Sequence, residues 1–170
     1  MPRVFLSLGS NIEPERHIQA ALSALEAAFG PLEVSPIYRT QAVGFQGDPF
    51  LNLAVAFPSA LPPQAIHERL DAIEQALGRR RDGPRFSSRT IDIDLLLHGD
   101  IVLEDGRLIL PRPEILTQAF VLVPLCDLAP ELIHPTEGAP LARLLARLDY
   151  DPTALERVTL TDRDCAPRPR

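Results

Sequence analysis

Two aspartates that lie two residues apart in an apolar segment have the clearest capacity for chemistry. Asp92 and Asp94 alternate with apolar residues over residues 91–95, so strand periodicity predicts that both carboxylates share one face. Carboxylates this close repel each other unless a cation intervenes, and Mg²⁺ combines a few protein carboxylates with water and phosphate oxygens. The pair therefore indicates a magnesium site. An isolated pair is also compatible with a solvated strand face that prevents aggregation.

The segment directly before this strand is strongly basic. Five arginines and one aspartate lie within residues 79–89, a net charge of +4 in a chain whose formal net charge is −6. Guanidinium groups bind phosphate oxygens as planar forks, and a polyphosphate with its magnesium would satisfy both the arginines and the aspartates. Pairing between surface arginines and aspartates is the alternative, and it would contribute little stability. Gly83 and Pro84 favour a loop that closes over the phosphates as a lid.

A polar residue in the third predicted strand, residues 50–57, marks a second candidate site. Asn52 is the only polar side chain in this run, and a buried amide left unpaired costs about 1–3 kcal/mol. Neighbouring backbone could satisfy it. Alternatively, its donor and acceptor bind the edge of a heterocycle, with Phe50 on the same strand face as a stacking surface. The turn-rich residues 41–49, together with Thr40, would then form a wall of the pocket.

The composition excludes several classes of protein. All 17 basic residues are arginine, so a Walker-type phosphate loop, a protein-kinase site and a Schiff-base nucleophile are excluded. The negative net charge argues against nucleic-acid binding through global charge. Cys126 and Cys165 are too few for a disulfide framework or a metal cluster. Without a signal-peptide pattern or an apolar run approaching 18 residues, the sequence predicts a cytoplasmic protein.

The order of the predicted elements is typical of an α+β, ferredoxin-like fold, whose antiparallel sheet would position these residues. Apolar periodicity predicts strands over residues 4–8, 32–40, 50–57 and 90–97, with helices over residues 14–29 and 66–77. This is a βαββαβ core. Beyond it we expect C-terminal additions: a hairpin over residues 101–110, an apolar run over 120–125 and a helix over 140–148. Residues 1–160 are expected to form a single catalytic domain, and residues 161–170 a frayed tail.

Several segments, taken in order, carry a resemblance to a known family. They are residues 9–11, 38–40, 50–52, 89–95 and 124–135, together with Phe120. This set resembles the 6-hydroxymethyl-7,8-dihydropterin pyrophosphokinase family of folate biosynthesis, and residues 89–95 downstream of an arginine loop are its most specific part. The resemblance implies transfer of the β,γ-pyrophosphate of ATP to the hydroxymethyl group of a reduced pterin, leaving AMP. It also implies Mg²⁺ as cofactor, with two ions expected.

The resemblance assigns roles to individual residues. Asp92 and Asp94 would bind the two Mg²⁺ ions, and Arg79 and Arg89 would stabilise charge on the transferring group. The implied ATP contacts are Asp71, Glu74, Arg81, Arg89, Leu95, Arg107, Ile109 and Arg112. The implied pterin contacts are Thr40, Val43, Phe50, Asn52, Phe86 and Phe120, with Phe50 and Phe120 on the two sides of the ring.

The chain departs from the family pattern in two loops. Ser87 and Ser88 replace a frequent Gly-Pro before the aspartate strand. In the later loop, over residues 111–114, Arg112 replaces a frequent histidine, and Gln118 stands where an arginine is expected. Arg112 would substitute in ATP binding.

Two other classes remain open on the residues alone. A different two-metal nucleotidyl or phosphoryl transferase could use paired aspartates on a ferredoxin-like sheet, although no basic, aromatic groove for a template is apparent. A non-catalytic ligand-binding module would leave the arginine–aspartate arrangement unexplained. We expect an enzyme that acts as a monomer on small-molecule substrates, without nucleic-acid or membrane partners.

Overall fold

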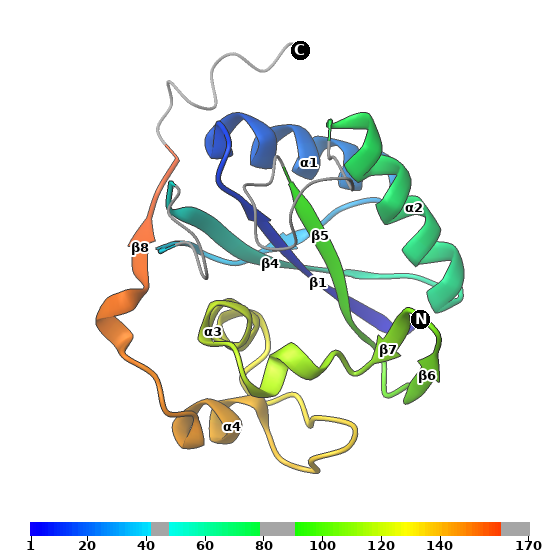
Figure 1. Cartoon of the computed structure of the whole chain (residues 1–170). Coiled ribbons are helices and arrows are strands. Elements are labelled where there is room, and N and C mark those ends of the chain that lie inside the picture. Colours follow the sequence, from blue (N-terminus) through cyan, green and yellow to red (C-terminus); the bar gives the residue numbers. More distant parts are fainter. Residues whose placement is uncertain (42–47, 79–90, 161–170) are drawn as a thin grey trace.

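An antiparallel sheet forms the centre of the fold (Figure 1). The computed structural model describes residues 1–41, 48–78 and 91–160, and within them the strand order is β5-β1-β4-β3-β8, with β2 also paired to β4. The strands of this sheet are β1 (Arg3–Ser10), β2 (Glu33–Val34), β3 (Ile37–Thr40), β4 (Phe50–Pro58), β5 (Asp92–His98) and β8 (Glu156–Val158). With two helices between these strands, the predicted ferredoxin-like βαββαβ core is confirmed.

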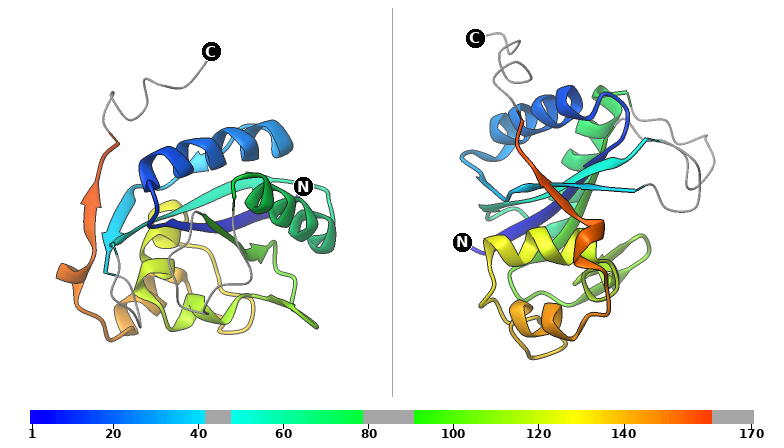
Figure 2. Two further views of the ribbon diagram at one scale, coloured as in Figure 1. Left: turned by 45° about the horizontal axis from the view of Figure 1, so that its top comes forward. Right: turned by 90° about the vertical axis from the view of Figure 1, so that its left-hand side faces the viewer.

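The helices cover the sheet from both sides (Figures 1 and 2). The first pair, α1 (Pro14–Phe29) and α2 (Pro63–Ala76), lies on one face, and α3 (Ala119–Leu128) lies on the other, with α4 (Leu141–Arg147) behind it. Both α1 and α2 have a proline in the first turn, where its missing N–H costs no hydrogen bond. Helix α1 ends at Gly30, whose φ of 92° suits a residue without a Cβ.

Strand alternation gives the two faces of the sheet different characters. Leu6, Leu53 and Leu95 belong to a buried cluster with residues of α1 and α2. Phe5 and Leu96 belong to a second cluster, with residues of α3 and α4. On this second face the apolar side chains occupy one end, and polar residues follow along the same strands toward the other end. The second face is therefore only partly apolar, and its polar end is the candidate site.

The predicted strand over residues 32–40 is broken in the structure. It forms two short strands, β2 and β3, that both pair with β4. At the break, Ser35 N donates to Ala54 O at 2.9 Å and Ala54 N donates to Ser35 Oγ at 2.8 Å. Pro36 has no N–H to continue the ladder. The local sequence thus interrupts the strand without moving it away from its neighbour.

The C-terminal half contains the predicted additions and one unpredicted strand. The hairpin consists of β6 (Leu103–Asp105) and β7 (Leu108–Leu110), and α4 confirms the last predicted helix. The apolar run over residues 120–125 lies within α3, and β8 was not anticipated. The predicted lid and the predicted frayed tail lie outside the described residues. Among the described helices, none is both long enough and apolar enough to cross a bilayer.

Candidate functional site

The two aspartates of β5 lie on one face of the sheet, as the sequence predicts. Asp92 is opposite Gly9 and Asp94 is opposite Ser7 on β1. Both aspartates are half-buried, whereas the intervening Ile93 is buried in the cluster under α1 and α2. The register therefore brings two carboxylates to the polar end of the second face.

One cross-strand row connects Asp92 with the second candidate site. Gly9 is paired with Asp92 on one side and with Asn52 of β4 on the other. Asn52 in turn is paired with Tyr38 of β3, and Tyr38 with Arg157 of β8. Directly paired residues present their side chains on the same face. The acidic pair and the asparagine therefore share a surface across three adjacent strands, although Asp92 follows Asn52 by 40 positions in the sequence.

Asn52 is held by a side chain rather than by backbone. It is 4% exposed, and its Nδ2 donates to Thr40 Oγ1 at 2.7 Å. A Cβ added to Gly9 would lie 2.8 Å from Asn52 Oδ1 and 3.8 Å from Phe50 Cδ1. Phe50 and Asn52 thus both approach Gly9, which confirms that they share a face. Only glycine at position 9 allows this approach without displacing the amide.

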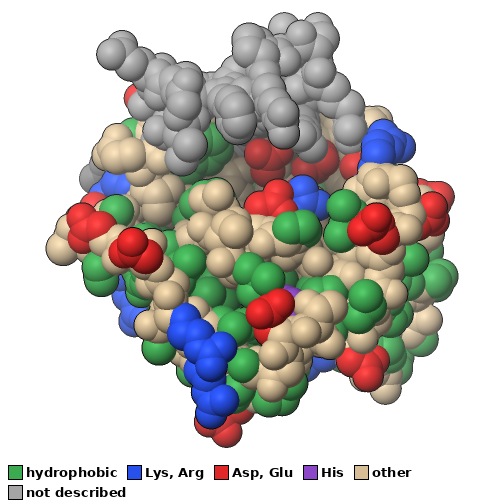
Figure 3. Space-filling model, turned by 60° about the horizontal axis from the view of Figure 1, so that its bottom comes forward, with side chains coloured by type: hydrophobic (Ala, Val, Ile, Leu, Met, Phe, Trp, Pro, Cys, Tyr) green, Lys and Arg blue, Asp and Glu red, His purple; other side chains and the backbone are tan. Residues whose placement is uncertain are grey.

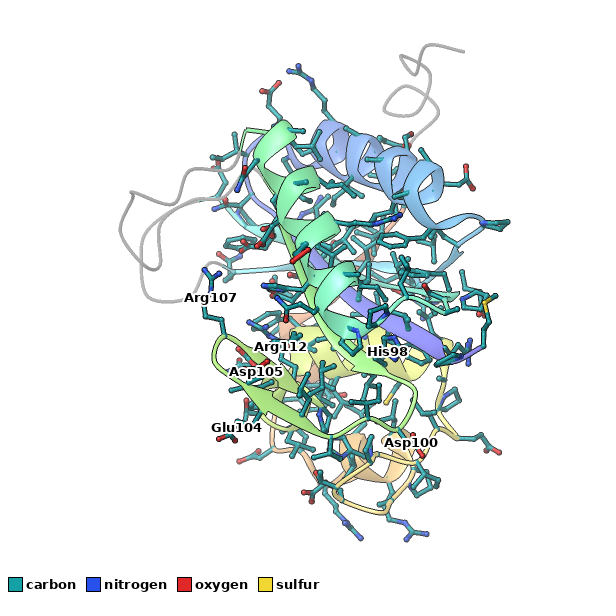
Figure 4. All side chains as sticks on the ribbon, turned by 90° about the vertical axis from the view of Figure 1, so that its right-hand side faces the viewer. His98, Asp100, Glu104, Asp105, Arg107 and Arg112 are labelled. Carbon is teal, nitrogen blue, oxygen red and sulfur yellow. The ribbon has the colours of Figure 1, made fainter. Side chains whose placement is uncertain are left out.

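Arg112 places a cation beside the acidic pair. Its backbone N donates to Leu96 O at 3.0 Å, which fixes the loop after β7 along the outer side of β5. The guanidinium lies 3.6 Å from Asp94 Oδ1 and 3.5 Å from Glu114 Oε1. Figure 4 shows Arg112 between β5 and the hairpin, and in Figure 3 acidic and basic side chains gather together in a hollow of the surface. The guanidinium is therefore within reach of a phosphate that a metal ion at Asp94 would hold.

The other predicted nucleotide residues of the hairpin differ in exposure. Arg107 lies in the turn between β6 and β7, is exposed, and projects from the hairpin tip (Figure 4). Ile109 is half-buried between Leu108 and Leu110, which are both buried. The side chain of Leu95 is 2% exposed in the apolar core, on the face opposite to the aspartates. Any nucleotide contact at Leu95 would therefore involve its backbone.

Helix α2 supports β5 directly. Glu74 is 1% exposed, and its Oε2 accepts a hydrogen bond from Ile93 N at 2.6 Å. Since Ile93 stands between the two aspartates, this carboxylate holds the outer side of the strand that carries them. One turn earlier, Asp71 lies 3.7 Å from His67 Nε2. Nucleotide contacts by Asp71 and Glu74 stay predictions.

The remaining predicted residues fall into two groups. Phe120 is half-buried in the first turn of α3, so the two aromatic residues predicted to enclose the pterin come from α3 and β4. The other group lies outside the described residues, and its roles stay predictions: Val43, Arg79, Arg81, Phe86 and Arg89.

The acidic pair suits a metal that takes most of its ligands from elsewhere. Within the described residues, no group of three or more His, Cys, Asp or Glu side chains could hold a metal ion. Mg²⁺ commonly takes one or two carboxylates and completes its shell with water and substrate phosphates. Asp92 and Asp94 fit this donor set.

Residues that sequence reasoning did not assign to the site also converge here. Gly9 pairs with Asp92 in one half of the site and with Asn52 in the other, and Tyr38 hydrogen-bonds to Asp127 of α3 and to Arg157 of β8. Gly9, Tyr38 and Asp127 had a signal, because each lies in a segment that carries the family resemblance. Arg157 had none, since its contacts depend on the pairing of β8 with a distant segment.

The fold and the site define an α+β protein of the ferredoxin-like class, with an acidic pair and a buried amide on one sheet face. The chain belongs to the 7,8-dihydro-6-hydroxymethylpterin-pyrophosphokinase family, whose sequence model matches residues 5–130.

Curated relatives and solved structures agree with this assignment. The chain is 41% identical over 153 residues to the 2-amino-4-hydroxy-6-hydroxymethyldihydropteridine pyrophosphokinase of Pseudomonas aeruginosa, covering 88% of this chain and 93% of the relative. It is 41% identical over 162 residues to the enzyme of the same name from Methylorubrum extorquens, covering 93% and 99%. A crystal structure of wild-type Plasmodium falciparum HPPK-DHPS with pteroate matches with a TM-score of 0.70 at 14% identity. That match covers 86% of this chain but only 42% of the solved chain, and it supports the fold alone.

Proposed function

We propose that this protein transfers pyrophosphate from ATP to the hydroxymethyl group of 6-hydroxymethyl-7,8-dihydropterin, giving AMP and the pterin diphosphate in folate biosynthesis. The relatives at 41% identity carry the name of this enzyme. The observation that carries the proposal is the cross-strand row, in which Gly9 pairs with both Asp92 and Asn52. A phosphate-metal half and a heterocycle half of one site thereby lie side by side.

The proposed pterin half depends on an oriented amide. Thr40 Oγ1 accepts one N–H of Asn52, so the amide is held in one orientation. Its Oδ1 and second N–H can then serve as an acceptor and a donor for the edge of the pterin. Phe50 and Phe120 would supply apolar surfaces on the two sides of the ring. Val43 and Phe86 are proposed to complete this half.

The proposed phosphate half depends on opposite charges. Asp92 and Asp94 would hold two Mg²⁺ ions, which when bound neutralise charge on the triphosphate. Arg112, beside Asp94, would donate to phosphate oxygens, and Arg79 and Arg89 would stabilise the transferring group. The proposed nucleotide contacts are Asp71, Glu74, Arg81, Arg89, Leu95, Arg107, Ile109 and Arg112.

The reaction needs alignment rather than a protein nucleophile. The hydroxymethyl oxygen forms a bond to the β-phosphorus, the bond from that phosphorus to the oxygen shared with the α-phosphate breaks, and AMP leaves as the hydroxyl proton is released. Holding both substrates in line supplies much of the rate enhancement in such transfers. All proposed residues belong to one chain, which supports a monomer. We further propose that the protein is cytoplasmic and that its catalytic domain is residues 1–160.

A coupled assay tests the proposal. Protein, ATP, Mg²⁺ and the reduced hydroxymethylpterin are incubated together, and AMP is measured. AMP should form only with the pterin present, and it should disappear when Mg²⁺ is chelated or in Asp94→Ala. Asp100→Ala is the matched control, because Asp100 is exposed in the turn after β5, far from Arg112 in Figure 4. ADP as the product, or equal AMP without pterin, would refute the proposed reaction.

A further inference from the structure

We propose that Tyr38 and Asp127, braced by Arg157 of the C-terminal strand, form a positioning group that fixes α3 against the sheet at the pterin pocket. The inference rests on the proposed function, because it concerns how the two walls of the proposed pocket are held. The three residues are positioning residues rather than catalytic ones.

A compact hydrogen-bonded group joins three elements. The Tyr38 hydroxyl on β3 donates to Asp127 Oδ2 on α3 at 2.5 Å. Arg157 on β8 donates from Nη2 to the Tyr38 hydroxyl oxygen at 3.2 Å, and the same Nη2 is 3.7 Å from Asp127 Oδ1. The Arg157 guanidinium carbon also lies 5.7 Å from the centroid of the Tyr38 ring. Each residue therefore contacts both of the others.

The hydrogen bond between Tyr38 and Asp127 is the strong member of the group. Tyr38 is 7% exposed, and a buried phenol that loses its partner leaves an unsatisfied hydroxyl. A carboxylate acceptor makes the bond shorter and stronger than a neutral one. Burial, and next the hydrogen bond to Asp127, raise the pKa of Tyr38 above its ordinary value, so the hydroxyl keeps its proton and remains a donor. Arg157 is largely exposed and acts as a brace.

This bond is directly connected to both walls of the proposed pocket. On the sheet side, Tyr38 is the cross-strand partner of Asn52. On the helix side, Asp127 is seven residues after Phe120 in α3, and seven residues make about two turns, so both lie on the same side of the helix. A bond at Asp127 therefore restrains the helix face that carries Phe120. Since Phe50 is on β4, the restraint sets the separation of the two aromatic walls.

The C-terminal strand gives the group a second attachment. β8 pairs with β3, and Arg39 Nη1 lies 2.6 Å from Glu156 Oε1. In Figures 1 and 2, β8 lies at the sheet edge and the chain reaches it from the side of α4. The family match ends at residue 130, so this brace lies outside the matched segment. We therefore assign the C-terminal strand a part in holding the proposed pterin pocket, through the contacts of Arg157 with Tyr38 and Asp127.

The test compares variants that remove or keep the hydrogen bond. Tyr38→Phe and Asp127→Ala remove it, whereas Asp127→Asn retains an oxygen that accepts from the tyrosine. Tyr150→Phe is the matched control, because it makes the same change at the only other tyrosine of the chain. For each variant, we measure the equilibrium dissociation constant of the reduced hydroxymethylpterin, the KM for ATP, and the amide hydrogen exchange of α3 without ligand.

The expected result separates positioning from general stability. Tyr38→Phe and Asp127→Ala should weaken pterin binding about fivefold and speed exchange in α3, with the KM for ATP within about twofold of the unmodified protein. Asp127→Asn should recover most of the affinity, and Tyr150→Phe should change neither quantity. A smaller loss is expected for Arg157→Met.

Two results would overturn the inference: unchanged pterin affinity in Tyr38→Phe, or an equal loss of affinity for pterin and ATP. If the unmodified protein fails to bind the pterin, the proposed function fails. In that case, amide hydrogen exchange in α3 still tests the positioning role by itself. Unchanged exchange in Tyr38→Phe would reject that role.

Discussion

At the scale of single residues, the candidate site depends on how closely β1 approaches β4 at Gly9. The space where a Cβ would lie is limited by the Oδ1 of Asn52 at 2.8 Å. A contact this short forces a side chain to move. We propose that the Oδ1 of Asn52 accepts a hydrogen bond from the edge of the pterin. If Asn52 binds the pterin as proposed, we expect Gly9 to influence substrate specificity without contributing a side chain.

Gly9→Ala should weaken pterin binding about tenfold, because the methyl group displaces the oriented amide and costs about one hydrogen bond. The KM for ATP should change much less, since Asp92 and Asp94 are on the other neighbouring strand. Titration of the pterin by its own fluorescence, beside steady-state kinetics for ATP, measures both. An unchanged pterin affinity would contradict the role given to Asn52 Oδ1.

Arg112→Met should raise the KM for ATP about tenfold. The guanidinium is 3.6 Å from Asp94 and is only partly exposed, and a hydrogen bond to a charged group contributes about 1.5–3 kcal/mol, with the lower end expected at an accessible position. The comparison is with Arg143→Met, an exposed arginine on α4. If both variants show the same ATP kinetics as the unmodified protein, Arg112 has no part in nucleotide binding.

At the scale of elements, β5 carries the acidic pair as an edge strand of the sheet. Its outer side has no neighbouring strand within the described residues. Glu74 of α2 and the backbone of Arg112 satisfy its polar groups there, through Ile93 N and Leu96 O. The position of both aspartates therefore depends on a helix and a loop that both hydrogen-bond to the outer side of β5.

Glu74→Leu should reduce the free energy of unfolding by about 1–3 kcal/mol, because the N–H of Ile93 is left without its acceptor in a buried place. Glu74→Gln keeps an acceptor oxygen and should lose less. Denaturant unfolding of both variants measures the difference, and Mg²⁺ titration of activity shows whether the aspartates shift as well. Equal stability of the leucine and glutamine variants would show that the hydrogen bond to Ile93 is unimportant.

Local patterns account for the elements that were predicted, and distant pairings account for those that were not. The alternation of β5 and the apolar stripe of α2 are properties of adjacent residues, so the shared face of Asp92 and Asp94 followed from the sequence. The hydrogen bond between Tyr38 and Asp127 joins residues 89 positions apart, and no local pattern indicates it. Asn52 stands between these cases: its burial was predictable, but its partner Thr40 depends on the register of β3 with β4.

At the scale of the whole molecule, the segment between α3 and α4 contains a buried histidine that links stability to pH. His134 is 1% exposed, and its Nδ1 accepts hydrogen bonds from Thr136 N and Glu137 N, both at 3.2 Å. Its Nε2 is buried without a partner among the described residues. Protonating Nδ1 would therefore break two hydrogen bonds and place a positive charge in a buried position.

Burial lowers the pKa of His134, against a smaller opposing effect of Glu137. The fold thus favours the neutral ring, while the unfolded chain binds a proton near pH 6.5. This stabilisation is fully present above about pH 6.5 and is lost as the pH falls toward the lower pKa of the folded state.

His134→Asn, whose amide oxygen can replace Nδ1 as acceptor, should make the free energy of unfolding less dependent on pH between about 7 and 5. Denaturant unfolding across this range measures the slope, with His17→Asn at the start of α1 as the control. If His134→Asn retains the slope of the unmodified protein, the acid sensitivity arises elsewhere in the molecule.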